Sequence, residues 1–274
     1  SASPDPLYAF GSQDPERIIS TAPSITEMIF ALDAGDRLVG RTSYCDHPPE
    51  ASEISVIGDF ASPNVETVLD LNPDLLVLYS DRGELVRKFR PCGIPMLILE
   101  HESLEQILDS IEDLGAKIGR KDFARKLTGQ LKEQLQNLAG TPREGRPPSV
   151  LFLVSRNPGA LTEMYVAGAT SYIGRLVELA GGRNAFGDLQ TAYPKISIEQ
   201  ILARDPEWII DMSHGDGVSD RDVQEIVALW SNFGTLHAVE ENQVHVARSD
   251  VFIRPGPRVV EAVQRLIRII HEDR

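Results

Sequence analysis

Apolar residues along the chain fall into two alternating patterns. Short apolar runs of strand length alternate with longer segments in which apolar residues recur at steps of three and four, the spacing of one helix face. These patterns predict strands at 17–20, 38–40, 75–79, 96–99, 150–154 and 244–246. They predict one helix that begins near residue 24 and further helices at 85–89, 103–118, 171–179, 223–230 and 259–271.

The longest helical pattern, KDFARKLTGQLKEQLQNL at 121–138, divides the chain into two similar halves. Its apolar stripe consists of Phe123, Leu127, Leu131, Leu135 and Leu138. Polar and charged residues fill the other side. At 1.5 Å per residue this stretch makes a rod of about 27 Å. The helix is expected to end at Gly140, before a segment rich in proline and glycine.

An internal repeat links the two halves. ETVLDLNPDLLVLYS begins at Glu66 and EQILARDPEWIIDMS begins at Glu199, and both read as a helix, a turn with proline, and a buried strand. The two glutamates and the two prolines are each 133 residues apart. This constant offset indicates duplicated structural units.

Strands and helices alternate throughout, which predicts an α/β fold of two similar lobes with mainly parallel sheets, joined by one long helix. The expected divisions are an N-terminal α/β lobe at 1–119, an interlobe helix at 120–140 and a C-terminal α/β lobe at 141–274. Ligands of open α/β sheets bind at the carboxyl ends of the strands. We therefore expect a ligand cleft between the lobes.

Composition narrows the possible functions. A formal charge of −14 argues against a protein that tracks nucleic-acid phosphates. The polar, proline-rich opening is typical of a mature amino terminus after processing or trimming, and it leaves export open. Cys45 and Cys92 are expected at opposite edges of a parallel sheet, so two unpaired thiols are favoured over a disulfide.

Five aromatic residues follow predicted strands or precede predicted helices, on the expected ligand side: Tyr44, Phe60, Tyr79, Tyr165 and Tyr193. Aromatics make up only 6% of the chain, so five in such places is a concentration. A single aromatic there is usually part of the core edge. Five facing one cleft would give flat apolar walls with phenol tips, suited to a large planar ligand such as a corrin or porphyrin.

Two long stretches resemble a known family: RIISTAPSITEMIFALDAGDRLVGRTSYCDHPPEA with NVETVLDLNPDLLV in the first half, and ISIEQILARDPEWII in the second. They are similar to the class III substrate-binding proteins of ABC importers, which carry cobalamin, haem and ferric siderophores. The resemblance covers about residues 17–270, is closest to the cobalamin-binding members, and is most specific in SYCDHPP. It implies a periplasmic or lipid-anchored protein with two lobes bridged by one long helix, and no catalytic residues.

The resemblance also implies roles for particular residues. Glu66 and Glu199 match the family's docking glutamates, one per lobe, that contact arginines of the permease. A carboxylate in the first turn also stabilises a helix by itself, and that interpretation stays open. Asp250 and Arg254 match a loop that contributes an acid and an arginine to the ligand site, with a local surface salt bridge as the alternative. Tyrosines at 79 and 193 stand where the relative has tryptophan, which weakens the choice of ligand.

The leading prediction is a monomer that captures a corrinoid and delivers it to the permease and ATPase of an ABC importer, without a cofactor or metal of its own. Haem or a ferric siderophore is the alternative, because Arg41, Arg82 and Arg156 also follow predicted strands and arginines suit anionic chelates. The six histidines show no metal-site spacing. Only His47 is kept as a ligand contact, including an axial bond to cobalt or iron.

A two-lobed cleft enzyme, with Asp250 or Glu27 as the base and the arginines as an anion clamp, is a third interpretation. An enzyme would not account for the repeat and its matched glutamates. The sequence also contains no nucleophile and base in a recognisable catalytic order.

Overall fold

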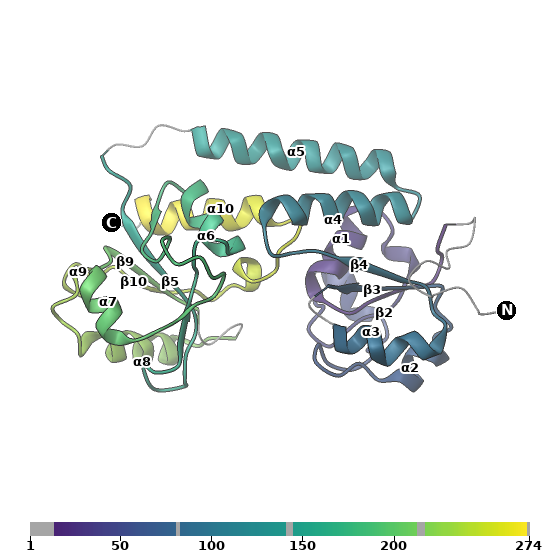
Figure 1. The fold of residues 1–274 in the computed structure, drawn as a ribbon, viewed down its shortest axis with the longest axis horizontal. Coiled ribbons are helices and arrows are strands. Elements are labelled where there is room, and N and C mark those ends of the chain that lie inside the picture. Colours follow the sequence, from purple (N-terminus) through teal and green to yellow (C-terminus); the bar gives the residue numbers. More distant parts are fainter. Residues whose placement is uncertain (1–13, 81–82, 141–144, 213–216, 273–274) are drawn as a thin grey trace. The chain divides into compact units, whose positions relative to one another are not determined.

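The protein consists of two compact α/β units. The computed structural model describes residues 14–80, 83–140, 145–212 and 217–272. Unit 1 comprises the described residues up to His101 together with Glu105–Lys132 and Arg254–Pro257, and unit 2 comprises Glu102–Leu104, Glu133–Ile253 and the described residues from Arg258 onward. The predicted α/β class and the two repeated sheets are confirmed (Figure 1).

Unit 1 is built on a four-stranded parallel sheet in the order β2-β1-β3-β4. Its elements are β1 (Ile18–Ser20), α1 (Pro23–Ala31), β2 (Leu38–Gly40), α2 (Val65–Asp70), β3 (Leu75–Tyr79), α3 (Gly83–Phe89), β4 (Met96–Leu99) and α4 (Leu104–Lys117), with short 3-10 turns at Gly35–Arg37, Pro49–Glu53 and Arg90–Cys92. Every residue of β3 is buried, as expected for a central parallel strand covered on both faces. Figure 1 shows α1 and α4 on one face of this sheet and α2 and α3 on the other.

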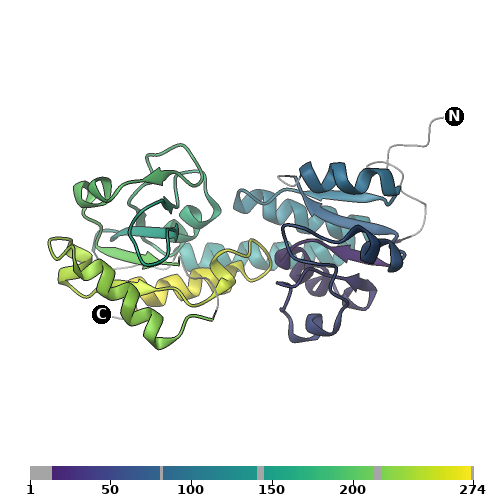
Figure 2. The same ribbon diagram turned by 90° about the horizontal axis from the view of Figure 1, so that it is seen from below.

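Unit 2 contains a six-stranded mixed sheet in the order β10-β9-β5-β6-β8, with β7 paired to β5. Its elements are β5 (Ser149–Ser155), β6 (Met164–Val166), α6 (Tyr172–Leu179), β7 (Arg183–Asn184), β8 (Lys195–Ile196), α7 (Ile198–Arg204), β9 (Trp208–Asp211), α8 (Asp220–Ser231), α9 (His237–Glu240), β10 (Val244–Val246) and α10 (Val259–Ile267), with a 3-10 turn at Asp250–Phe252 and a π-helical segment at Arg268–Glu272. The pairs β10/β9, β9/β5 and β5/β7 are parallel, while β6 runs antiparallel to both β5 and β8. Ile226 and Trp230 of α8 pack into the core of this sheet, and Figure 2 shows α8 from below.

The 133-residue repeat corresponds to equivalent structure in both units. It contains α2 followed by β3 in unit 1, and α7 followed by β9 in unit 2. Val68 and Ile201, at matching positions, are both fully buried. The turns also agree, because Asn72 and Asp205 both adopt the left-handed conformation, with φ of 45° and 44°. Asparagine and aspartate tolerate this conformation better than most residues, so the pattern fits the turn.

The acidic residue after each repeat proline makes an equivalent hydrogen bond in the two units. The carboxylate of Asp74 accepts the backbone N–H groups of Glu16 and Arg17, just before β1 begins. The carboxylate of Glu207 accepts the backbone N–H of Ser149, where β5 begins. Each acid thus fixes the start of the strand that pairs with its own strand, β1 with β3 and β5 with β9.

The predicted long helix is α5 (Lys121–Gly140), which belongs to unit 1 up to Lys132 and to unit 2 from Glu133. Its buried positions are Ala124, Thr128, Leu131 and Leu135. Phe123 is 46% exposed, so placing it in the inward stripe was wrong. The buried row turns toward alanine and threonine because α4 approaches closely there, with the Thr128 hydroxyl donating to Glu112 at 2.7 Å. The predicted divisions at 120 and 140 and the predicted cleft stay predictions.

Two smaller expectations can be compared with the structure. The first helix begins at Pro23 with Ala22 as its N-cap residue, so the predicted start at Ser24 is one residue late. Cys45 and Cys92 are both free thiols, as predicted. Among the described helices, none has the length and apolar character needed to cross a bilayer.

Candidate functional site

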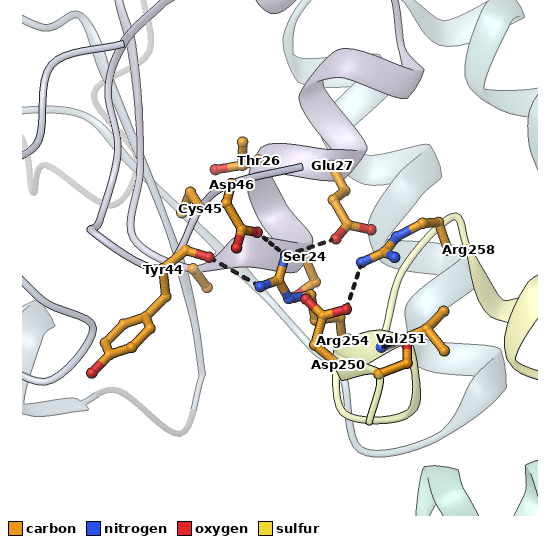
Figure 3. Close-up of polar contacts among 12 residues, drawn as sticks. Ser24, Thr26, Glu27, Tyr44, Cys45, Asp46, Asp250, Val251, Arg254 and Arg258 are labelled. Atoms are coloured by element: carbon orange, nitrogen blue, oxygen red, sulfur yellow. Dashed lines mark hydrogen bonds and ion pairs between the residues drawn. The ribbon is translucent and has the colours of Figure 1, made fainter. Parts of the chain in front are cut away.

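In unit 1 the loop after β2 carries Tyr44 and is held in place by Arg254. The guanidinium of Arg254 donates to the Asp46 carboxylate at 2.5 Å and to the backbone oxygen of Tyr44 at 3.2 Å (Figure 3). The Glu27 carboxylate lies 3.5 Å from the same Nη1. The side chains of Arg254 and Glu27 are 7% and 2% exposed, so this ion pair is buried. With its backbone anchored in this way, Tyr44 presents its ring to solvent and is 61% exposed.

The Tyr44 loop is also attached to the loop that carries Phe60. The backbone N–H of Ser43 donates to the Gly58 oxygen at 2.9 Å. Gly58 has φ of 119°, a conformation that favours glycine, and the chain turns here toward the half-buried Phe60. The two predicted aromatic residues of these loops are therefore in connected segments at one edge of the unit 1 sheet.

Tyr79 differs from the other predicted aromatic residues. It is the last residue of β3 rather than part of a loop, and it is only 3% exposed. Its hydroxyl lies 2.8 Å from the Ser24 hydroxyl, and its ring packs 4.0 Å from the His101 ring, centroid to centroid. These contacts place Tyr79 at the core edge, where it supports the surface of the unit. Its role as a ligand contact stays a prediction.

In unit 2 the structure brings Tyr165 and Tyr193 to the same end of the sheet. Tyr165 lies within β6, not in a loop, and pairs with Ser155 at the carboxyl end of β5 and with Lys195 of β8. Tyr193 is two residues before Lys195, in the segment entering β8. The two tyrosines are 38% and 42% exposed. Desolvation raises the pKa of the Tyr193 phenol to about 12, with the nearby charge of Glu102 adding to the shift. Tyr193 is therefore a neutral hydrogen-bond donor at physiological pH.

Asp250 and Arg254, predicted together from the sequence, each take part in an ion pair. Asp250 lies 3.5 Å from the guanidinium of Arg258, and both of these side chains are largely buried (Figure 3). Arg254 holds the Tyr44 loop, as described above. The surface salt bridge considered as the alternative does not fit Arg254, because its side chain is buried. Direct contact of either residue with a ligand stays a prediction.

The arginines that suggested an anionic chelate are used inside the units. Arg41 donates to backbone oxygens of the Tyr44 loop and its continuation, at 3.0 Å to Thr42 and 2.9 Å to Ser52. Arg156 is fully buried and pairs with Asp211 at 3.0 Å. Both side chains stabilise loops or the core, so the expectation that they line a ligand surface is not supported. Arg82 lies outside the described residues.

Glu66 and Glu199 occupy equivalent and exposed positions. Glu66 is the second residue of α2 after the N-cap Asn64, and Glu199 is the second residue of α7 after the N-cap Ser197, as predicted. Both are exposed. A hydrogen bond from Ser197 lowers the pKa of Glu199, and a backbone hydrogen bond at the helix start adds to this. Glu199 is therefore ionised at any pH near neutral.

In the described part of the chain, no group of three or more histidine, cysteine, aspartate or glutamate side chains is arranged to hold a metal ion. His47 is half-buried in the Tyr44 loop, and its role as an axial ligand stays a prediction. Glu27 and Asp250, the bases considered for an enzyme, are both held by guanidinium groups.

Sequence reasoning missed residues that hold the predicted site residues of unit 1 in place. Asp46, Ser24 and His101 were not singled out, although each contacts a residue that was. A signal was available for Asp46, which stands two residues after Tyr44 in the most specific motif. No local signal connects Arg254 with Glu27, because they are 227 residues apart.

Comparisons with known proteins agree with this architecture. A family model described as "Periplasmic binding protein" matches residues 18–251. A vitamin B12-binding protein of Vibrio cholerae is 28% identical over 254 residues, which cover 92% of this chain and 87% of the relative. An uncharacterised ABC transporter substrate-binding lipoprotein of Bacillus subtilis is 29% identical over 269 residues, covering 95% and 82%.

Among solved structures, the periplasmic heme-binding protein RhuT from Roseiflexus sp. RS-1 superposes with a TM-score of 0.77 at 26% identity, covering 94% of this chain and 98% of that one. The two sheets, the repeat and the family match over most of the chain lead to one conclusion. The chain belongs to the periplasmic binding protein family and is a class III substrate-binding protein of ABC importers.

Proposed function

We propose that this protein captures a corrinoid outside the cytoplasm and delivers it to the permease and ATPase of an ABC importer, as a transported ligand rather than a cofactor. The observation that carries the proposal is the placement of exposed aromatic side chains, Tyr44 in unit 1 and Tyr165 with Tyr193 in unit 2. Ligands of α/β sheets bind at strand carboxyl ends, and Tyr44 follows the carboxyl end of β2 while Tyr165 pairs with Ser155 at the carboxyl end of β5. Similarity to the vitamin B12-binding protein of Vibrio cholerae supports this choice of ligand.

Haem is the second candidate, supported by the similarity to the heme-binding protein of Roseiflexus. His47 in the Tyr44 loop would supply the axial nitrogen that haem iron takes in many proteins. The presence of arginines after strands gives less support to an anionic chelate, because Arg41 bonds to a backbone oxygen and Arg156 pairs with Asp211 within their units.

Two titrations on the purified protein separate the candidates. Cyanocobalamin in a calorimeter should give saturable heat with an affinity tighter than about micromolar. Haemin added to the protein and followed by absorption spectroscopy should show no shifted Soret band. If a shifted band appears and His47→Ala removes it, while cyanocobalamin gives no heat, haem rather than a corrinoid is the ligand. A response to neither ligand would contradict both.

The exposed Glu66 and Glu199 are proposed as the docking carboxylates, one in each unit, for arginines of the permease. Their equivalent and exposed positions on α2 and α7 support this, in addition to the stabilisation that a first-turn carboxylate gives each helix. Replacing both by alanine should leave corrinoid affinity unchanged and abolish uptake. Unchanged uptake would contradict the docking role without affecting ligand binding.

A further inference from the structure

The helices α2 and α7 expose more than a glutamate. Leu69 is 45% exposed and Leu202 is 38% exposed, and both are among the few large apolar side chains that reach the surface. They are 133 residues apart, the offset of the repeat, so they occupy the same place in the two units. Each stands three residues after its glutamate, Leu69 after Glu66 and Leu202 after Glu199.

The helix geometry puts each leucine beside its glutamate. Residues three apart lie on one side of a helix, with about 5–6 Å between their Cβ atoms. Val68 and Ile201, directly before the leucines, are fully buried and fix which side of each helix faces the core. The glutamate and the leucine therefore share the outer side in both units, as one carboxylate next to one apolar side chain.

A single exposed leucine would carry no argument, because leucine favours helices and scattered apolar residues are normal on surfaces. The recurrence is informative because the neighbouring exposed positions differ. Asp70 in α2 corresponds to Ala203 in α7, whereas the glutamate and the leucine are the same in both. The shared surface is thus limited to this pair of residues.

We propose that Leu69 and Leu202 are docking residues, each forming with its glutamate a two-residue patch that fits a partner surface with a cationic side chain next to an apolar one. The proposal rests on the proposed function, and the occupant is the membrane part of the importer. A carboxylate at a wet interface mainly supplies orientation and a faster association. The adjacent leucine excludes water from that contact and slows dissociation.

The experiment compares kinetic constants for binding to the importer complex of the same organism, permease plus ATPase, reconstituted in nanodiscs. Biolayer interferometry at 50 and 500 mM NaCl gives association and dissociation rates for the full chain and its variants. Leu69→Ala/Leu202→Ala should raise the dissociation rate about tenfold and leave the association rate within about twofold. Glu66→Ala/Glu199→Ala should lower the association rate at low salt and remove its salt dependence.

Matched variants separate docking from general surface effects. Phe123→Ala removes an equally exposed apolar side chain outside the repeat and should leave both rates unchanged. Leu69→Gln/Leu202→Gln keeps a side chain of similar size but makes its end polar, and it should act like the alanine pair. Both leucine variants should lower the melting temperature only slightly and keep the cyanocobalamin affinity of the parent protein, since neither leucine is among the buried core residues.

The outcomes distinguish the two proposals. If the glutamate variant binds like the parent protein, the docking role of the proposed function fails. If the glutamates matter but the leucine variants dissociate at the parent rate, or no faster than Phe123→Ala, then only the leucine proposal is overturned. Faster dissociation in both leucine variants, with an unchanged salt dependence, supports it.

Discussion

Replacing Arg254 with methionine should destabilise unit 1 and loosen the Tyr44 loop at the same time. Arg254 is the common partner of Glu27, Asp46 and the backbone oxygen of Tyr44. Methionine retains much of the side-chain volume, so the change removes mainly the charge and its hydrogen bonds. The Glu27 carboxylate, 2% exposed, then loses the Arg254 cation that lies 3.5 Å away.

The size of the effect follows from burial. Asp46 is 60% exposed, so its contact with Arg254 contributes at most about 1 kcal/mol. The buried contact with Glu27 dominates, because removing one partner of a buried ion pair costs about 3–5 kcal/mol. For a protein of this size a loss of 1 kcal/mol lowers the melting temperature by about 2–4 °C. The expected decrease is therefore roughly 6–20 °C.

Urea unfolding and calorimetry measure this loss, and the order of effects among variants tests its cause. Arg254→Met/Glu27→Gln should recover part of the stability, because the carboxylate left behind is no longer charged. Arg221→Met, which breaks an exposed ion pair with Glu225 on the same helix, should change the free energy of unfolding by less than about 1 kcal/mol. A loss below 1 kcal/mol for Arg254→Met would refute the buried-pair reasoning.

Further predictions concern unit 2. Arg156→Met should lower the free energy of unfolding by about 3–5 kcal/mol in urea, since it removes the guanidinium that lies 3.0 Å from the fully buried Asp211 carboxylate. No loss of stability would contradict this. Ser197→Ala should raise the pKa of Glu199 toward its usual value, because the bond from Ser197 is the largest cause of the lowered pKa. A carbon-13 NMR titration of the Glu199 carboxyl measures this, and an unchanged midpoint would refute the assignment. Because the folded-state pKa of Glu199 is lowered, its stabilising contribution is present above the ordinary carboxyl pKa and is lost as the pH falls through the lowered value.

Much of the fold could be predicted because its elements are long or strongly periodic. Strands β4 and β10 were predicted with their observed bounds, and α5 was found because its apolar spacing extends over many turns. Strand β6 and the two-residue strands β7 and β8 were missed. The conformation of these three strands is set by pairing with β5 or β6 across the sheet, which the local sequence does not show.

The candidate site was less predictable, because its contacts also join residues that are far apart in the sequence. The repeat located Glu66 and Glu199 because the offset is visible along the chain. Aromatic residues near strand ends could be named, but Tyr79 is buried against Ser24 while Tyr44 is exposed, and only packing decides between these outcomes. Arginines after strands looked alike in the sequence. The structure pairs Arg156 with Asp211 and directs Arg41 to backbone oxygens, contacts that depend on folding across many residues.

In unit 1 the proposed docking residue Glu66 and the Tyr44 loop belong to the same edge of the sheet, which predicts the footprint of the importer. Helix α2 ends at the amino edge of its sheet, because Arg17, just before β1, donates to the Leu71 oxygen at 2.6 Å. Glu66 lies about 7 Å farther along the helix axis, toward the edge where Tyr44 lies. On the proposed function, a permease that binds Glu66 therefore approaches unit 1 from the edge where Tyr44 lies.

Hydrogen exchange on the complex with the importer in nanodiscs tests this footprint. Backbone amides of the Tyr44 loop, residues 42–47, should become protected on docking, while the amides of Glu16 and Arg17 at the amino edge should exchange as in the free protein. Glu66→Ala/Glu199→Ala is the control and should remove the protection. Protection confined to the amino edge would show that the partner approaches from the side away from the aromatic residues, and it would separate docking from ligand delivery.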